Sequence, residues 1–435
     1  MEIRHKPRYN KEYLDLIKKS KLFKTTNSEL HYVSLLSQLE KRYILGDYHS
    51  TVSKKIEIYQ ELYAKQSLGK DYYPSNLGSI WTNVVGHEAQ IGSLKLCSKY
   101  KIIQEGKRNI DIAHTKKESL LLSLYDDFLN VNYSTRSLID VSYFPSQFYR
   151  YEDLNLWKTK DSFEDYFSVL DRVFQMYDSD PDAFEFVFSP EVKESYFKKL
   201  ESLGLPKKAW FVVVHVKETP KNANQRRSAS VQNFDKSCRY ITSQDGWVIQ
   251  IGFKNSTKLN LDKNFIDLRG ESIDRTNLHI FVLANAKFFL GTMSGLSPTT
   301  ALFKTPMLIT NSVTLGTLTI NYNSLTRFLP KTVLHIDTKR KLSFREILDS
   351  CEGFGEMHTT DLKKKSLCLI ENSAQEIYDA TLDFFSVLSS NPKQKNNNLI
   401  GADQISKIRC DYPFTSTGSF SESYLSENPD WFKHE

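Results

Sequence analysis

Residues 288–311, FFLGTMSGLSPTTALFKTPMLITN, decide the fold of this protein. An apolar strand (287–290) ends at Gly291, a turn of small residues follows, and a helical stretch (298–303) leads to a second strand (306–310). Short apolar strands joined by helices are typical of a parallel sheet that helices cover on both faces. The segment therefore predicts an α/β protein.

The same alternation continues on both sides of this segment. A helix that begins at Ser189 and Pro190 and closes near Gly204 precedes it, and a helix that begins after Ser373, with Glu376 completing a capping box, follows it. We expect further strands at 210–215, 247–251, 264–267 and 333–336, and further helices near 230–243, 274–286 and 343–350.

The length of 435 residues exceeds that of one ordinary core, which predicts two domains. No apolar run approaches the roughly 20 residues of a membrane span, and no apolar stretch of signal-peptide type follows the basic start of the chain. The five cysteines are odd in number, far apart and without CxxC spacing. This pattern argues against a disulfide framework or a zinc site and suits a reducing cytoplasm.

The net charge of +6 lies in the first 70 residues. These residues hold 14 Lys or Arg and 8 Asp or Glu. The whole chain has 58 basic and 52 acidic residues, so the remainder holds 44 of each and is neutral. Two interpretations stay open for this basic segment: contact with anionic lipid head groups or an acidic partner, or solvated helix faces. Because a nucleic-acid binder carries its excess charge on the binding domain, we expect no nucleic-acid partner. Residues 28–66 resemble a single tetratricopeptide-like hairpin.

The first candidate site follows the strand in WFVVVHVKETPKNANQRRSAS, residues 210–230. Ligands of an open parallel sheet bind at the carboxyl ends of its strands, and cations placed there are suited to gripping a diphosphate. Glu218 is either a base or the partner of a neighbouring cation, and a solvated charged loop is the alternative for the whole stretch. The candidate residues are His215, Lys217, Glu218, Arg226 and Arg227.

The second candidate site is the turn after the strand that ends at Gly291. Ser297 is the predicted N-cap of the following helix, with Pro298 at its first position, and free backbone N–H groups at a helix start bind anions. Thr292 and Ser294 add hydroxyl donors, and Gly295 lets a phosphate or ribose approach the backbone. An ordinary strand-to-helix turn uses the same residue types and stays open as the alternative.

A third candidate is His87 in VVGHEAQIG, residues 84–92, between a predicted strand and a helix. An imidazole with a pKa near neutrality suits general-base work on a hydroxyl group. A structural histidine at a helix start is the alternative, and Glu88 competes for the same role. The sequence has no GxGxxG, GxxxxGK[ST] or GxSxG motif, and the DSD at 178–180 is interpreted as a turn because Pro181 follows it.

The order of these motifs resembles a family of bacterial glycosyltransferases of surface-polysaccharide synthesis. The resemblance covers about residues 190–350. It is carried by six stretches: LESLGLP, WFVVVHVKE, GWVIQIG, the 288–311 segment, LPK and LSFREIL. More distantly, HVK is similar to the His-x-Arg motif of the GT-B fucosyltransferases, which include protein O-fucosyltransferases. The resemblance implies a GT-B fold, in which two Rossmann-like domains face each other across a cleft and the C-terminal one binds the donor.

The resemblance also implies domain bounds. We expect a basic helical segment at 1–70, a Rossmann-like acceptor domain at 71–188 and a Rossmann-like donor domain at 189–392. Residues 393–435 are expected to be a linker and a tail that packs back on the body through Tyr424, Leu425 and Trp431.

Individual roles follow from the matching positions. Lys217 occupies the place of an arginine that binds the donor diphosphate, Ser294 and Gly295 belong to the turn that contacts nucleotide or phosphate, and Lys331 in LPK faces the cleft. The sequence differs from the family pattern at Lys217 itself, at Ser228 where an asparagine is expected, and at Gln250 and Phe253, where an arginine and an acidic residue are expected.

The resulting hypothesis is a metal-independent glycosyltransferase without a cofactor. It moves a sugar from a nucleotide sugar to a saccharide or lipid-linked saccharide in capsule or O-antigen synthesis, in the cytoplasm at the inner face of the membrane. Lys217 and Arg227 replace the divalent ion of other transferases, and Glu218 or His87 deprotonates the acceptor. Two alternatives stay open: a non-hydrolysing nucleotide-sugar epimerase, and a non-catalytic binding subunit of a polysaccharide assembly complex.

Overall fold

The structure is a computed structural model. It describes residues 92–102, 108–112, 120–133, 156–158, 163–218, 228–313, 325–350, 362–389 and 418–432, apart from residues 94, 181, 184, 185, 271 and 363. The hairpin predicted at 28–66 and the basic segment at 1–70 lie outside these residues. No described helix has the length and apolar character needed to cross a bilayer.

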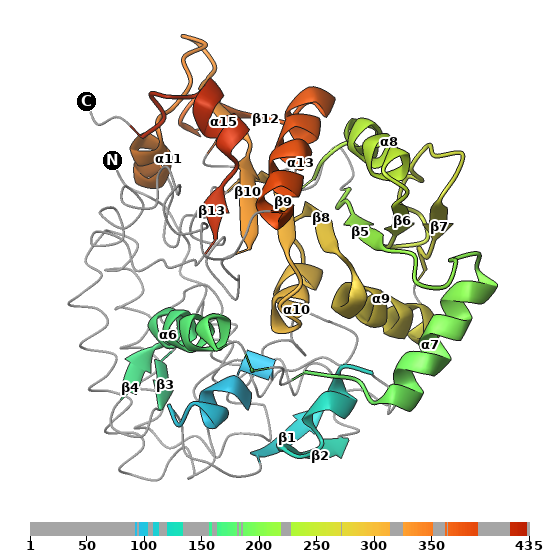
Figure 1. The fold of residues 1–435 in the computed structure, drawn as a ribbon. Helices are drawn as coiled ribbons and strands as arrows, with labels where there is room; N and C mark the ends of the chain where they lie inside the picture. Colours follow the sequence, from blue (N-terminus) through green and yellow to red (C-terminus); the bar gives the residue numbers. More distant parts are fainter. Residues whose placement is uncertain are drawn as a thin grey trace, which may run out of the picture.

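The described part of the chain is built around a seven-stranded sheet (Figure 1). All its strands are parallel. In spatial order they are β13 (Ser419–Phe420), β10 (Thr326–Pro330), β9 (Met307–Ser312), β8 (Phe288–Thr292), β5 (Phe211–His215), β6 (Trp247–Gln250) and β7 (Phe265–Asp267).

Read from the β7 edge, the strands stand in the chain order third, second, first, fourth, fifth, sixth, and the short β13 follows as a seventh strand at the far edge. This is the order of a doubly wound, Rossmann-type sheet. The chain first winds from β5 outward to β7, then returns to the other side of β5 and winds outward through β8, β9 and β10. The predicted α/β class is confirmed, and the Rossmann-like donor domain at 189–392 stays a prediction.

Two helix layers follow from this winding. Parallel crossovers are almost always right-handed, so reversing the direction of winding moves the connecting helices to the other face of the sheet. Accordingly α8 (Asp235–Ser243) packs against α13 (Ala374–Ser389), while α9 (Ile273–Asn285) packs against α10 (Leu296–Leu302). A further helix, α7 (Pro190–Ser202), leads into β5, with Ser189 as its N-cap as predicted. The 3-10 turn η5 (Val231–Phe234) precedes α8.

The core of the sheet lies at β5 and β8, in which every residue is buried. Such unbroken burial explains why both strands read as continuous apolar runs rather than as an alternating pattern. Phe288 of β8 packs against Phe384 and Phe385 of α13, with ring centroids 5.2 and 5.5 Å apart. The helix predicted after Ser373 therefore covers the centre of the sheet.

One predicted strand belongs elsewhere, and two strands of the main sheet, β10 and the short β13, escaped prediction. The stretch 333–336 is not part of the parallel sheet, because β11 (Thr332–His335) pairs antiparallel with β12 (Leu367–Ile370) in a separate hairpin-like sheet. The sixth strand of the main sheet is β10, whose sequence TRFLP carries charge and a terminal proline that hid it. The helix α11 (Phe344–Ser350) follows β11, close to its predicted position.

The C-terminal tail packs back on the body as predicted. Residues 419–420 form the edge strand β13, and α15 (Glu422–Glu427) follows it. Tyr424, Leu425 and Trp431 are all buried. The ring of Trp431 lies 5.1 Å from that of Phe344 in α11, so the tail packs against α11.

The N-terminal half of the chain is described only in parts. These are the parallel pair β1 (Arg108–Ile112) and β2 (Leu129–Tyr133), the antiparallel pair β3 (Leu156–Lys158) and β4 (Phe163–Asp165), the turn η2 (Leu122–Tyr125) and the helix α6 (Tyr166–Ser179). The Leu120 amide donates to Asn277 Oδ1 of α9 (2.9 Å), and the Tyr177 hydroxyl donates to the Leu302 carbonyl of α10 (2.8 Å). Leu120, just before η2, and Tyr177 of α6 thus contact the α9–α10 layer, and the Rossmann-like acceptor domain at 71–188 stays a prediction.

Candidate functional site

The winding of the sheet reverses between β5 and β8, which are neighbours in the sheet. Ligands of doubly wound sheets bind outside the carboxyl ends of the strands at this reversal. Here the two carboxyl ends are joined directly, because the Lys217 amide donates to Thr292 Oγ1 (2.8 Å). The candidate stretches predicted after β5 and after β8 thus meet at one point, where Lys217 is partly exposed and Thr292 is buried.

His215, the last residue of β5, is buried in this sheet edge. Its Nδ1 lies 3.3 Å from the carbonyl oxygen of Ile251, and burial lowers the pKa of the imidazole to about 4. The ring is therefore neutral near pH 7 and contributes no positive charge to an anion site. Its contact with Ile251 instead holds the end of β6 against the end of β5.

Gly291 is required by the packing of the strands. It stands beside His215 in the register of β5 and β8, and a Cβ atom at this position would lie 2.0 Å from the His215 carbonyl oxygen. Since β8 continues through Thr292, the strand does not stop at Gly291 as the sequence indicated. The glycine allows the close approach of two strands.

The prediction that Ser297 caps the following helix is wrong. The helix α10 begins at Leu296 after Gly295, and the side chain of Ser297 is fully buried. Its hydroxyl accepts a hydrogen bond from the Ser294 amide (3.3 Å), while Ser294 Oγ accepts one from the Leu296 amide (3.2 Å). The turn is therefore closed by its own serines, with the hydroxyl of Ser294 bonded to the first amide of the helix.

Glu218 and Ser228 flank the stretch 219–227, which lies outside the described residues and contains Arg226 and Arg227. His87 also lies outside the described residues. Glu218 is exposed, and its carboxylate accepts a hydrogen bond from the Thr257 amide. The residue after Ser228, Ala229, donates its amide to the Lys217 carbonyl (3.1 Å). Both flanks are thus fixed at the carboxyl edge of the sheet.

Lys331 reaches the same edge from β10. Its Nζ donates to the Ser228 carbonyl (2.7 Å), and the side chain is buried. Burial lowers the pKa of this ammonium group to about 8, and the carboxylate of Glu371 opposes the shift. The observed contact makes Lys331 a residue that fixes the main chain next to Lys217.

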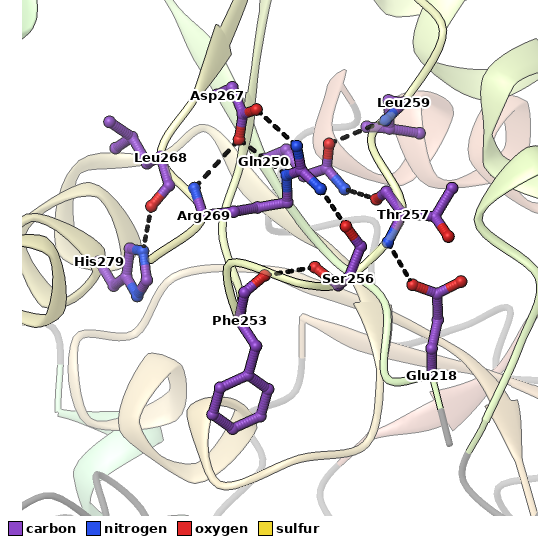
Figure 2. A network of polar contacts seen from close by, with 10 residues as sticks. All are labelled: Glu218, Gln250, Phe253, Ser256, Thr257, Leu259, Asp267, Leu268, Arg269 and His279. Atoms are coloured by element: carbon purple, nitrogen blue, oxygen red, sulfur yellow. Dashed lines mark hydrogen bonds and ion pairs between the residues drawn. The ribbon is translucent and has the colours of Figure 1, made fainter. Parts of the chain in front are cut away.

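A clamp of side chains that the sequence did not reveal lies beside this point (Figure 2). Gln250 donates its Nε2 to the Thr257 carbonyl (2.7 Å) and accepts the Leu259 amide on its Oε1 (2.9 Å). Asp267 holds the Arg269 guanidinium through two hydrogen bonds, 2.9 Å from Nε to Oδ1 and 2.8 Å from Nη2 to Oδ2. The signal was present as polar residues at the ends of two predicted strands.

A second hidden element is a pair of buried asparagines. The Asn311 amide donates to Asn372 Oδ1 (2.7 Å), and the Asn372 amide donates to Asn311 Oδ1 (2.9 Å). Asn311 adopts φ +53°, a left-handed conformation that asparagine tolerates better than most residues. The pair ties the carboxyl end of β9 to the start of α13.

A hollow of about 860 Å³ lies apart from the reversal, between β11, α11 and α15. Several of its charged lining residues bind each other or their neighbours. Arg340 donates to the Glu346 carboxylate from both terminal nitrogens, Nη1 and Nη2, and Lys341 Nζ donates to Asn428 Oδ1 (3.0 Å). We place no site there. The described residues hold no group of three or more His, Cys, Asp or Glu arranged for a metal ion.

Fold and site together define a doubly wound α/β protein with a candidate anion site at the reversal of its sheet. No protein family and no curated protein matches the sequence. Among solved structures, the chain is similar to the ADP-heptose lipopolysaccharide heptosyltransferase II of E. coli (12% identity, 70% of this chain and 81% of that chain, TM-score 0.32). It is also similar to a family 9 glycosyl transferase of Veillonella parvula (11% identity, 65% and 77%, TM-score 0.28).

A third similar structure is the iron-containing dodecameric glycosyltransferase TibC of enterotoxigenic E. coli (17% identity, TM-score 0.22). The match covers 28% of this chain and spans about a third of TibC, 33% of its length. Identities and TM-scores at this level do not assign the chain to a family. Its function is therefore argued from the sheet and the site.

Proposed function

We propose that the protein is a glycosyltransferase that binds a nucleotide-sugar donor at the carboxyl ends of β5 and β8. The observation that carries the proposal is the contact of Lys217 with Thr292 at the reversal of a doubly wound sheet. Sheets of this order bind nucleotides at that point, and the diphosphate lies at the end of the first strand, here β5. The motif order that resembles bacterial glycosyltransferases favours sugar transfer over other uses of such a site.

The proposed roles divide between charge and positioning. Lys217, together with Arg226 and Arg227 of the stretch beyond Glu218, neutralises the donor diphosphate and stabilises the leaving nucleotide without a metal ion. Ser294 and Gly295 border the same phosphates from the β8 side. Lys331 acts on the donor through the main chain at Ser228.

The proposed base for the acceptor hydroxyl is Glu218 or His87. The exposed carboxylate of Glu218 stands next to Lys217 in sequence and keeps one oxygen beyond its contact with the Thr257 amide. The acceptor in this proposal is a saccharide or lipid-linked saccharide of a bacterial surface polysaccharide, reached at the inner face of the membrane.

A thermal-shift panel tests the donor site. UDP, GDP, CDP, CMP, ADP and dTDP are added with and without magnesium to the wild type and to Lys217→Ala. A ligand at a hundredfold excess over its Kd stabilises the folded state by about 2.7 kcal/mol. We expect one nucleotide to raise the Tm of the wild type without magnesium, and we expect Lys217→Ala to lose that shift.

Lys207→Ala is the matched control, because Lys207 is exposed and lies before β5, at the opposite edge of the sheet. It should keep the full shift. Binding that requires magnesium and ignores Lys217 would contradict the metal-free donor site. Binding of no nucleotide at all would reject the proposed function.

A further inference from the structure

The loop after β6 carries an exposed aromatic ring. Among the residues that the structure describes, six large apolar side chains are exposed, and Phe253 is the most exposed of them at 68% and the only aromatic one. A single exposed apolar residue is ordinary on a protein surface. Phe253 is of interest because it lies in the loop after β6, at the carboxyl edge of the main sheet, and because hydrogen bonds fix that loop on several sides.

Hydrogen bonds hold the main chain of residues 252–259 (Figure 2). The Phe253 carbonyl accepts from the amide and the hydroxyl of Ser256 (3.1 and 2.7 Å), which closes a tight turn. Further along the loop, Arg269 donates a hydrogen bond to the Ser256 carbonyl and Gln250 donates one to the Thr257 carbonyl. Glu218 receives the Thr257 amide from the opposite side.

The first residue of the loop is fixed as well. The Gly252 carbonyl accepts from the Gly270 amide (2.8 Å), and Gly252 has φ +141°, which an L side chain rarely adopts. The loop therefore needs little ordering when a ligand arrives, which lowers the entropic cost of binding. In Figure 2 the ring of Phe253 points away from the polar clamp that fixes its backbone.

The loop starts beside the proposed diphosphate site. A Cβ atom on Gly252 would lie 3.4 Å from His215 Nδ1, so the end of β6 touches the end of β5. Neighbouring strands are about 4.8 Å apart, and a doubly wound sheet that binds diphosphate at its first strand directs the nucleoside toward the second. The second strand of this sheet is β6, which leads directly to Phe253.

We propose that Phe253 is the stacking platform for the base of the bound nucleotide, presented by the loop that Gln250, Arg269 and Glu218 fix in place. The inference rests on the proposed function, since it assumes a nucleotide at the end of β5. Stacking on a phenyl ring uses the face of the base rather than its hydrogen-bonding edge. Phe253 therefore contributes affinity for all bases, and Glu218 acts here as a positioning residue.

Calorimetric titration with ADP, GDP, UDP and inorganic pyrophosphate tests the inference. Loss of base stacking weakens binding by about 1–3 kcal/mol, or roughly 5- to 160-fold in Kd. Phe253→Ala should weaken whichever nucleoside diphosphates the wild type binds by that factor and leave the Kd of pyrophosphate within twofold. Phe253→Trp should restore the affinity, and Phe253→Leu, which keeps apolar area without a ring face, should not.

Leu203→Ala is the control, because Leu203 is also exposed (43%) and lies at the end of α7. The stacking role would be overturned if Phe253→Ala bound nucleotides as tightly as Leu203→Ala while Lys217→Ala lost them. The proposed donor site would then still stand. Equal loss of nucleotide and pyrophosphate would also overturn it, because the phosphate site would then be the part affected. A wild type that binds none of the nucleotides would reject both proposals.

Discussion

Gly291 shows how a single position is decided by backbone packing. Its missing side chain leaves room for the His215 carbonyl, since a Cβ atom would stand 2.0 Å away. Crowding of this kind in a packed region costs about 1–3 kcal/mol, and more where the backbone has to move. We therefore expect Gly291→Ala to lower the free energy of unfolding by at least that amount, measured by urea denaturation.

Gly295→Ala provides the comparison for this substitution. Gly295 is exposed and has φ −60° and ψ −16°, values that any residue adopts. The change should raise the free energy of unfolding by less than about 1 kcal/mol, because alanine lowers the entropy of the unfolded chain. Equal destabilisation by the two substitutions would refute the packing argument.

The helix α13 covers the centre of the sheet, and its start is fixed by a reciprocal cap. The Glu376 amide donates to Ser373 Oγ (3.2 Å), and the Ser373 amide donates to Glu376 Oε2 (2.7 Å). Removing a serine cap costs about 1 kcal/mol. We expect Ser373→Ala to lose about that much stability in chemical denaturation.

Ser389→Ala tests the same residue type at the other end of α13. Ser389 is exposed, and its hydroxyl only returns to the Phe385 carbonyl (2.8 Å). Its loss should change stability by less than about 0.5 kcal/mol. If Ser373→Ala has an effect as small as this control, the cap does not stabilise the helix.

The tail from β13 onward is an integral part of the folded molecule. The Trp431 ring packs within 5 Å or slightly more of Phe344, Phe420 and Tyr424, with centroid distances of 5.1, 4.9 and 4.9 Å. Truncating a buried tryptophan to alanine costs about 3–5 kcal/mol. Trp431→Ala should therefore destabilise the whole protein by that amount in equilibrium unfolding.

Ile336→Ala is a suitable control for the tail, because Ile336 is 40% exposed. It should cost clearly less than Trp431→Ala, since two fifths of Ile336 stays in water when the protein folds, whereas Trp431 is buried. A loss below about 1 kcal/mol for Trp431→Ala would show that the tail detaches without disturbing the sheet. The domain would then end at α13.

The sequence by itself determined those strands of the main sheet whose side chains are mostly apolar. The runs at 211–214 and 288–290 are apolar throughout because β5 and β8 are covered on both faces, and such runs are visible without a structure. The prediction that Lys217 and Thr292 belong to one region also came from the sequence, because parallel strands share a carboxyl edge. The bond between them confirms that these two residues meet.

Only the tertiary structure decided the strand order and the work of the polar side chains. The order depends on long-range pairing, so β10 was missed and β11 was placed in the wrong sheet. Polar residues near a strand end have many possible partners, and only three-dimensional neighbours select among them. In the folded protein Ser297 is buried at the start of α10 instead of capping it. Gln250 holds the loop of Phe253, because folding brings the Thr257 carbonyl and the Leu259 amide within hydrogen-bonding distance of its side chain.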